Sequence, residues 1–343
     1  MTSLDRPPAS DRDKRIQATA ALRLPFEAPF DWDGVHAYLA ARAIPGVETA
    51  RRGLYARTVA SGGAHGIVRV ERASDDALAL TVAGTIHAAA ERAARLFDLN
   101  ADPNEIGRAL SADPFMAELV AARPGMRVPG AWDGFELAVR AILGQQVSVS
   151  AATRLAGKLV AAFGTPLMMA RDVAESGLTH IFPSPAALVD ADVALVLNMP
   201  RARGAAIRAV AAAVLSEPDL FDPGQGIATA TARLKALRGI GDWTAHYIAM
   251  RALREADALP TGDIGLLRAL EDEAGRPTAK ALEVRSAAWR PWRAYAVLHL
   301  WAHDAARLAL APPRPSKLRK SKKTIPEQGA GCGAPGTRAK VSP

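Results

Sequence analysis

The alternation of apolar and polar residues changes its period within the first hundred residues. Three runs alternate with a period of two and are separated by a Gly-Gly and an Asp-Asp pair, which predicts β-strands joined by turns. The predicted strands are residues 47–60, 65–73 and 77–84. Two flanking segments, 30–43 and 84–99, repeat apolar residues at helical spacing, and Asp31 or Asp33 stands near the start of the first. This part of the chain therefore predicts a small α+β domain.

From about residue 101 to residue 311, nearly every segment has the pattern of a helix. Glycine, proline and aspartate mark short connections, which suit a compact bundle. The predicted helices are 104–111, 114–122, 132–144, 148–163, 185–190, 192–197, 201–215, 226–237, 242–255, 263–272, 277–288 and 291–309. We expect four regions, namely a disordered N-terminus (1–22), a small α+β domain (23–100), a helical domain (101–311) and a basic disordered tail (312–343).

The composition narrows the classes of protein that fit this pattern. The 343 residues are 49% hydrophobic, which is enough to bury a substantial core. Cys332 is the only cysteine, and this excludes an internal disulfide, a four-cysteine iron–sulfur cluster and a zinc knuckle. No stretch approaches 18 uninterrupted apolar residues, and the N-terminus lacks the apolar segment of a signal peptide. We expect a cytoplasmic protein without a membrane partner.

The net charge of +8 is typical of a nucleic-acid partner, but its distribution weakens that inference. Eight basic residues and a single acidic residue, Glu327, lie in the segment 312–343, which therefore carries seven of the eight net positive charges. This tail could attract phosphates without sequence preference, or it could be a solvated, disordered end. Charge alone does not identify the partner.

The segment 237–247, LRGIGDWTAHY, is the most informative part of the chain. Two predicted helices meet across Gly239-Ile240-Gly241, and glycines allow both a sharp turn and a positive φ angle. The backbone N–H groups of this turn stand at the start of the second helix, where the helix dipole favours an anion. Such a hairpin can hold a DNA phosphate without charged side chains. Taken alone, the same turn also fits an ordinary joint between two helices.

The residues after this turn favour a functional interpretation. Trp243 and Tyr247 are four residues apart and so share one helix face. Asp263 follows in the segment PTGD, at the start of a predicted helix. From spacing alone, Asp263 fits an N-cap as well as a catalytic carboxylate, and the two roles are compatible. No histidine–carboxylate cluster has metal-ligand spacing, so we expect no catalytic metal.

Together these motifs resemble the helix–hairpin–helix glycosylase superfamily, and within it the DNA-3-methyladenine glycosylase II (AlkA) type. The resemblance runs from about Leu24 to Leu308 and includes PFDWDGVHAYLAARAIPGVE, ARPGMRVPGAWDGFELAVRAILGQQVSVSAA, LRGIGDWTAHYIAMRAL and WRPWRAYAVLHLW. It implies an α+β N-terminal domain followed by a mainly α helix–hairpin–helix glycosylase core. It further implies a monomeric, cofactor-free enzyme that flips alkylated purines of the 3-methyladenine and 7-methylguanine type out of double-stranded DNA in the nucleoid and excises them.

The resemblance also assigns roles to individual positions. Asp263 matches the catalytic aspartate, and the base pocket is formed by Trp243, Tyr247, Trp301 and Tyr38. The match to the residue that wedges into the DNA is Gln146, where some members carry leucine. The matching DNA contacts of the hairpin are Gly239, Ile240, Gly241 and Thr244. A monovalent cation on the main-chain carbonyls of Lys235, Leu237 and Ile240 is a further implication.

Two other functions remain open at this stage. A non-catalytic DNA-binding protein would explain the hairpin and the basic tail, but not Asp263 with its aromatic set. A glycosylase for oxidised or mismatched bases is the second alternative. Related bifunctional enzymes place a lysine nucleophile where this chain has Trp243, and others need four cysteines, so the common forms of that alternative are disfavoured. The same Trp243 predicts a monofunctional enzyme without a Schiff-base lyase step.

Overall fold

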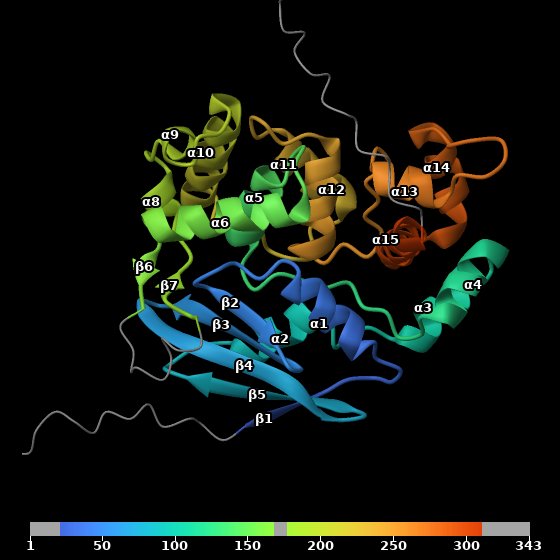
Figure 1. Ribbon diagram of the computed structural model, residues 1–343, viewed down its shortest axis with the longest axis horizontal. Coiled ribbons are helices and arrows are strands. Elements are labelled where there is room, and N and C mark those ends of the chain that lie inside the picture. The colour runs from blue at the N-terminus through green and yellow to red at the C-terminus, as the bar shows by residue number, and fades with distance from the viewer. Residues whose placement is uncertain (1–20, 168–176, 311–343) are drawn as a thin grey trace, which may run out of the picture.

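The computed structural model describes residues 21–167 and 177–310. The tail 312–343, with Cys332, and most of the N-terminal segment 1–22 lie outside the described residues, so the expectations about them stay untested. Within the described ranges the prediction of fold class is confirmed, because an antiparallel sheet in the N-terminal part is followed by a helical core (Figure 1).

The sheet of the N-terminal part is antiparallel and has the strand order β1-β5-β4-β3-β2. Its strands are β1 (Leu22–Pro25), β2 (Glu48–Arg51), β3 (Leu54–Ser61), β4 (Ala64–Ser74) and β5 (Ala77–Ala83). The predicted strand 47–60 is divided in two, because Arg52 and Gly53 adopt positive φ angles and form a turn. β1 was not predicted, since four residues ending in proline carry too short a pattern and are ordered by pairing with β5.

Two helices pack with this sheet around a separate apolar core. Helix α1 (Trp32–Ala40) begins after Asp31, whose carboxylate accepts a hydrogen bond from the Gly34 N–H at 2.9 Å. Helix α2 (Ala89–Phe97) begins five residues later than predicted, because positive φ angles at Gly84 and Ala88 separate it from β5. The side chains packed between helices and sheet include Val35, Leu39, Tyr55, Val70, Leu80, Ala93 and Phe97.

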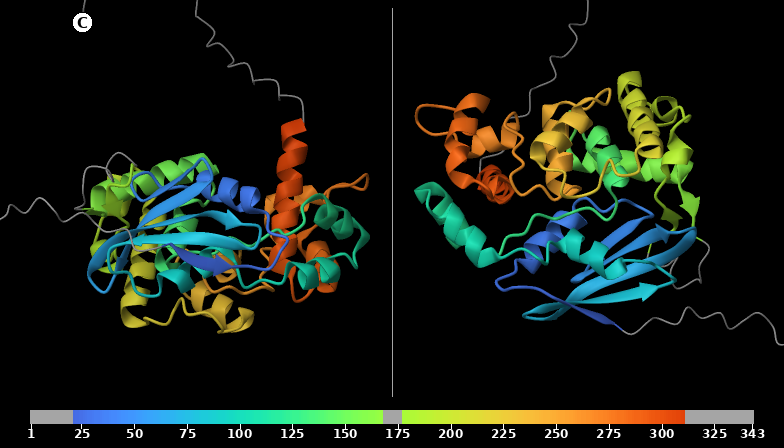
Figure 2. Two further views of the ribbon diagram at one scale, coloured as in Figure 1. Left: turned by 90° about the horizontal axis from the view of Figure 1, so that it is seen from below. Right: turned by 180° about the vertical axis from the view of Figure 1, so that it is seen from behind.

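The rest of the described chain is helical and lies along one side of the sheet (Figures 1 and 2). The helices are α3 (Pro103–Leu110), α4 (Pro114–Ala122), α5 (Gly134–Leu143), α6 (Val149–Phe163), α8 (Pro185–Leu188), α9 (Val193–Val196), α10 (Arg201–Ser216), α11 (Ile227–Lys235), α12 (Asp242–Arg251), α13 (Ile264–Ala269), α14 (Ala279–Arg285) and α15 (Arg293–Leu310). The predicted helix 277–288 is divided into α14 and a 3₁₀ turn, η1 (Ser286–Trp289). A short hairpin of β6 (Thr165–Pro166) and β7 (His180–Ile181) was not predicted.

Four charged side chains, three of them buried and Arg140 half-buried, join the sheet to helix α5. Arg57 on β3 contacts Glu136 on α5 at 2.5 Å, and Arg140 on α5 contacts Glu48 on β2 at 2.8 Å. Burial favours the neutral form of Glu48, but the guanidiniums of Arg140 and Arg57 outweigh it and hold the pKa of this carboxyl below its ordinary value. Arg140 also donates to the Arg42 carbonyl at 2.6 Å, so the network reaches the chain just after α1. The two parts of the molecule are thus connected by charge as well as by apolar contact.

None of the helices within residues 21–167 and 177–310 is both long and apolar enough to span a bilayer.

Candidate active site

A cavity of about 660 Å³ lies where helix α1 meets the helical part of the molecule. Its walls come from α1, α5, α6, α12 and α15, which are distant in sequence. Five of the residues selected from the sequence line it, namely Tyr38, Trp243, Tyr247, Asp263 and Trp301. A cavity of this size, lined mainly by apolar groups with a few polar atoms, is typical of a small-molecule or base-binding site.

Asp263 lies at the edge of this cavity as the N-cap of α13. Its Oδ1 accepts hydrogen bonds from the backbone N–H groups of Gly265 and Leu266 at 2.8 and 3.0 Å, and from Trp301 Nε1 at 3.1 Å. Its Oδ2 accepts one hydrogen bond, from Trp243 Nε1 at 2.7 Å. A carboxylate offers about two acceptor positions on each oxygen, so Oδ2 retains the capacity for one further hydrogen bond. The N-cap interpretation is therefore correct, and it leaves this oxygen available.

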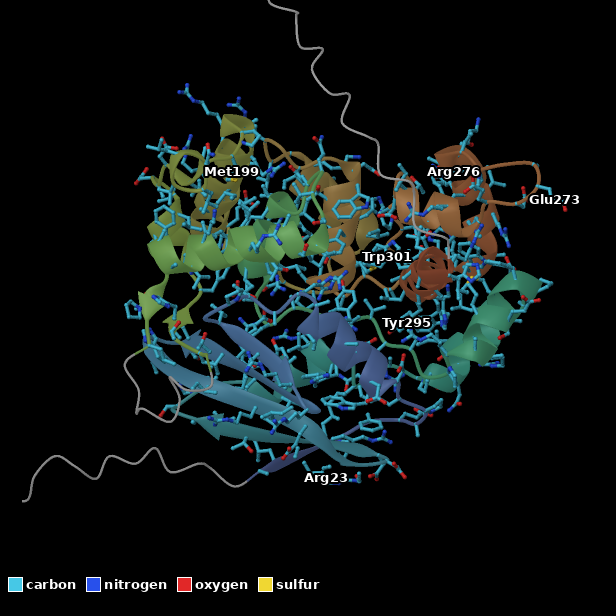
Figure 3. All side chains as sticks on the ribbon, viewed as in Figure 1. Arg23, Met199, Glu273, Arg276, Tyr295 and Trp301 are labelled. Carbon is cyan, nitrogen blue, oxygen red and sulfur yellow. The ribbon has the colours of Figure 1, made fainter. Side chains whose placement is uncertain are left out.

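Three aromatic rings stand beside this carboxylate. Trp243 and Tyr247, both on α12, stack with their centroids 5.2 Å apart and their planes 9° from parallel. Trp301 lies on the side of α15 that faces α12 (Figure 3), with its centroid 6.3 Å from that of Tyr247 and its plane tilted by 47°. Both indole N–H groups bind Asp263, so the aromatic set and the carboxylate form one connected unit.

Two tyrosine hydroxyls meet in the same cavity across the two parts of the molecule. Tyr38 Oη and Tyr247 Oη are 3.4 Å apart, and Arg251 Nη1 donates to Tyr247 Oη at 2.7 Å. Burial opposes ionisation of Tyr247, but the guanidiniums of Arg251 and Arg42 outweigh it and lower its pKa to about 7. For Tyr38 burial prevails, and the pKa of that hydroxyl is raised.

Sequence reasoning missed both arginines of this cluster. Arg42 follows Tyr38 by four residues, in the turn just after α1, and Arg251 follows Tyr247 by four residues, as the last residue of α12. A search for aromatic and basic residues at this spacing would have found them. Arg251 is 4% exposed, and its other nitrogens donate to the carbonyls of Pro129 and Gly130, which fixes its position.

The ring of Tyr38, which was expected to be part of the base pocket, is covered by two arginines. The Arg42 guanidinium carbon lies 3.7 Å from the ring centroid and that of Arg251 lies at 4.9 Å. These cation–π contacts occupy the ring, because a guanidinium is attracted to the electron-rich face of an aromatic side chain. Tyr38 therefore contributes its hydroxyl to the cavity more than a stacking surface.

The hairpin between α11 and α12 is formed as expected. Gly239 has a φ of +86°, and a Cβ there would lie 2.6 Å from the Ala206 side chain, so only glycine fits this close approach to α10. Gly241 has an ordinary φ of −87° and open space around it. Both glycines are exposed, and no described group accepts a hydrogen bond from either N–H.

Two residues of the hairpin differ from the expectation of a DNA contact. Ile240 is 5% exposed and its N–H donates to the Leu237 carbonyl at 3.1 Å, so this N–H is already used within the turn. Thr244 is 4% exposed and its hydroxyl accepts a hydrogen bond from Gln145 Nε2 at 3.2 Å. Because both side chains are buried, they hold the hairpin on the core, and the exposed glycines present its outer surface.

The loop that carries Gln146 is tied to this hairpin. Gln145 Nε2 also donates to the Gly239 carbonyl at 3.0 Å, and Arg203 on α10 donates to the Gln145 carbonyl at 2.7 Å. Gln146 is exposed and has a φ of +59°, so its side chain projects from a fixed, left-handed position in the loop. Gln145 was not predicted, because its partners lie 94 and 99 residues away in sequence.

The carbonyls proposed for a cation retain free acceptor capacity. The Leu237 carbonyl accepts a single hydrogen bond, from Ile240, while those of Lys235 and Ile240 accept none from the described residues. Their chemistry fits a cation, since hard cations prefer carbonyl oxygens. Elsewhere within residues 21–167 and 177–310, no group of three or more histidine, cysteine, aspartate or glutamate side chains could hold a metal ion.

Two family models match the chain in succession. The AlkA N-terminal domain matches residues 21–133. The HhH-GPD superfamily base excision DNA repair protein matches residues 139–294, which include the hairpin and Asp263.

Two relatives and one solved structure extend this similarity. The chain is 35% identical over 288 residues to DNA-3-methyladenine glycosylase 2 of Escherichia coli, covering 81% of this chain and 95% of that protein. It is 44% identical over 287 residues to the "Probable bifunctional transcriptional activator/DNA repair enzyme AlkA" of Mycobacterium tuberculosis, covering 82% of this chain but only 57% of that protein's length. The 3-methyladenine DNA glycosylase of Archaeoglobus fulgidus shares the fold, with a TM-score of 0.71 at 22% identity over 83% of this chain and 98% of the other.

Proposed function

This chain belongs to the family of DNA-3-methyladenine glycosylase 2, the AlkA type of the HhH-GPD superfamily, and from that premise we propose that it excises alkylated purines from double-stranded DNA. The products are a free base and an abasic site. The protein acts as a monomer on DNA of the nucleoid and needs no organic cofactor.

One observation carries the proposal, namely the carboxylate of Asp263 held between two indoles at the edge of a cavity. The bond between an alkylated purine and its sugar breaks to leave positive charge on the sugar. A fixed carboxylate stabilises that charge without having to reorganise during the reaction. Oδ2, the oxygen with spare acceptor capacity, also accepts a hydrogen bond from the attacking water.

Access to the bond requires base flipping, which costs a few kcal/mol and least for damaged bases. The exposed N–H groups of Gly239 and Gly241 bind the DNA backbone, and the exposed side chain of Gln146 fills the space that the base leaves. Gln145 links the loop of Gln146 to the hairpin. The hairpin, which binds the DNA backbone, and Gln146, which fills the vacated space, therefore move as one rigid body. A monovalent cation on the carbonyls of Lys235, Leu237 and Ile240 stabilises the hairpin and adds positive charge near the phosphate.

The flipped base stacks between Tyr247 and Trp301. A planar ring between two others needs roughly 7 Å, twice the optimal contact distance of about 3.5 Å. The ring centroids are 6.3 Å apart and the planes are tilted by 47°, so the two rings have to separate further and turn toward parallel as the base enters. A cationic base over Trp or Tyr gains about 0.5–2 kcal/mol, which selects alkylated purines by charge.

The geometry disfavours both alternatives. A non-catalytic DNA clamp has no use for a carboxylate that two indoles orient toward a cavity. A lyase of the bifunctional type needs an amine at position 243, where this chain has an indole whose N–H is committed to Asp263. Borohydride should therefore trap no covalent adduct between the enzyme and damaged DNA at levels typical of a bifunctional enzyme.

The direct test is base release from duplex DNA treated with a methylating agent. Chromatography of the supernatant should show free 3-methyladenine and 7-methylguanine, with no strand cleavage before the abasic sites are broken chemically. Unmethylated duplex of the same sequence is the control. Binding to methylated DNA without release of any base would contradict the proposal and support the clamp.

A further inference from the structure

An ion pair joins helix α13, which begins after Asp263, to helix α15. Arg268 on α13 donates from Nε to Asp304 Oδ1 on α15 at 2.6 Å, and its Nη2 contacts Oδ2 of the same carboxylate. Asp304 is 6% exposed, whereas the Arg268 side chain is 32% exposed. Among the described residues, Arg268 is the only ionic partner of Asp304. The buried negative charge of Asp304 is therefore compensated by one arginine.

This ion pair lies next to the carboxylate of Asp263. A Cβ on Gly265, where α13 passes α15, would lie 3.0 Å from Asp263 Oδ1 and 3.5 Å from Asp304 Oδ2. The two carboxylate oxygens are therefore no farther apart than the sum of these distances. Trp301, which binds Asp263, stands three residues before Asp304 on α15. Neither Arg268 nor Asp304 lines the cavity, so neither touches a base bound there.

Charges this close act on one another, because partly buried groups are only weakly screened by water and salt. The hydrogen bond from Arg268 to Asp304 raises the pKa of the guanidinium, and the negative charges of Asp304 and Asp263 add to this effect. Arg268 thus lies within the field of both carboxylates. Because it is paired with Asp304, the two together present no net charge to Asp263.

We propose that Asp304 is a positioning residue that holds the Arg268 guanidinium in a neutral pair, so that the charge of Asp263 acts on the sugar alone. The inference rests on the activity proposed above. Bond cleavage builds positive charge on the sugar, which a carboxylate stabilises and a nearby unpaired guanidinium opposes. Asp304 exchanges no proton with the substrate. It acts only through Arg268.

A purely structural role of the pair makes a different prediction. If the pair only ties α13 to α15, Arg268→Gln and Asp304→Asn break the same tie, and combining them restores nothing. If the charges matter, the two variants act with opposite signs. Asp304→Asn leaves a positive charge beside Asp263, and Arg268→Gln leaves a second negative charge there. The double variant removes both charges and so restores a neutral neighbourhood.

The pH dependence of the rate separates these signs. Activity falls at low pH when Asp263 takes up a proton, and a nearby negative charge moves this fall to higher pH, whereas a nearby positive charge moves it to lower pH. The other charged or titratable groups facing Asp263 and the pair are Tyr247 and Arg251 on α12, Glu271 after α13, and His299, His303 and Arg307 on α15. All of them are present in every variant, so a difference between variants reports the altered pair.

The experiment measures single-turnover release of 7-methylguanine from duplex DNA by the full-length protein between about pH 4.5 and 8.5. At neutral pH, Asp304→Asn should lower the rate about tenfold, because the free guanidinium opposes the charge on the sugar. The double variant Arg268→Gln/Asp304→Asn should recover to within about threefold of the wild type. The fall at low pH should lie about one pH unit higher in Arg268→Gln than in Asp304→Asn.

A matched control is Asp257→Asn. Asp257 binds Arg293 on α15 through the same two nitrogens, Nε at 2.6 Å and Nη2 at 2.8 Å, but neither residue lines the cavity or contacts Asp263. This variant should lower the melting temperature and leave the rate at saturating enzyme unchanged.

The inference is overturned if the double variant is no faster than Asp304→Asn, or if both single variants lose rate equally and share one pH profile. Should Asp304→Asn fail to fold, Arg268→Gln decides against the wild type, because its fall at low pH must then lie at the higher pH. Failure of the wild type to release 7-methylguanine contradicts the glycosylase activity itself, so the two failures are distinguishable.

Discussion

The hairpin and the cavity address DNA in opposite ways. The hairpin presents backbone, because its two glycines are exposed while the side chains of Ile240 and Thr244 are buried. The cavity presents side chains, and the carboxylate, the indole N–H groups and the Tyr247 hydroxyl there are already hydrogen-bonded to one another or to Arg251. Backbone N–H groups do not distinguish one base from another, so the hairpin suits binding of the phosphate backbone, which is uniform along the DNA. Side chains differ in charge, shape and hydrogen-bonding groups, so the cavity suits recognition of the one damaged base among normal ones. DNA affinity and the rate of base release should therefore respond to different mutations.

The largest effect on the chemical step is expected for Asp263→Asn. The amide keeps one oxygen for the N–H groups of Gly265 and Leu266, so α13 stays capped, but the negative charge is lost. Single-turnover release of 7-methylguanine should fall by roughly a hundredfold or more. Affinity for abasic-site DNA, measured by fluorescence anisotropy, should change little. Turnover close to that of the wild type would remove Asp263 from its assigned role.

Substitutions of Trp301 come next and separate two contributions of one side chain. Trp301→Ala removes both the stacking ring and the N–H that binds Asp263, whereas Trp301→Phe removes the N–H but keeps a smaller aromatic ring. Relative to Phe, the Ala variant should lose up to about thirtyfold in the rate for cationic 7-methylguanine, which corresponds to a cation–π contribution of about 2 kcal/mol. Its proportional loss on uncharged hypoxanthine should be smaller. Equal proportional losses on both bases would show that the ring supplies packing and not charge recognition.

A matched pair of glycine variants tests whether the hairpin backbone binds a DNA phosphate. Gly241→Ala adds a methyl group in open space at an ordinary φ, so the melting temperature should not fall, but the methyl group should hinder the approach of a phosphate. DNA affinity should drop several-fold, on the order of 1 kcal/mol, with the rate at saturating enzyme preserved. Gly239→Ala should instead destabilise the fold by about 1–2 kcal/mol, owing to its positive φ and the contact with Ala206. Wild-type affinity in Gly241→Ala would argue against a backbone grip at this point.

The smallest effect on the chemical step is expected for deletion of residues 312–343. This segment holds seven of the eight net positive charges, so its loss should weaken non-specific DNA binding and flatten the dependence of affinity on salt concentration. Base release at saturating enzyme should not change. A truncated protein that loses single-turnover activity would show that the tail contributes to the site and not merely to attraction.

The sequence was sufficient where a local pattern dictates the structure. Period-two alternation located β3 to β5, helical spacing located α1 and α12, and the PTGD segment located the N-cap of α13. It was insufficient where a short element depends on a distant partner, as β1 depends on β5 and β6 on β7. Alternation over four residues or fewer is too brief to detect, and pairing across the chain supplies the order instead.

The same limit applies to the candidate site. Motif resemblance selected Asp263 and the aromatic residues, and the structure places them around one cavity. It could not show that both indoles bind the carboxylate, or that Tyr38 meets Tyr247 across 209 residues of sequence. The first contacts depend on how α12, α13 and α15 pack within the helical part, and the second depends on how the two parts of the molecule pack; residue spacing along the chain encodes neither.

The buried charges between sheet and helix α5 have a consequence for anyone who recombines such proteins. Glu48 and Arg57 belong to the N-terminal match, while Glu136 and Arg140 follow it in the chain. Grafting residues 21–133 onto a host that keeps a basic residue at the position of Arg140 but lacks an acidic one at the position of Glu136 leaves two guanidiniums against the single carboxylate of Glu48, at a cost of about 3–5 kcal/mol. That is a large share of the 5–15 kcal/mol by which domains are normally stable. The junction of a chimera should therefore lie after α5, so that all four side chains come from the same parent protein.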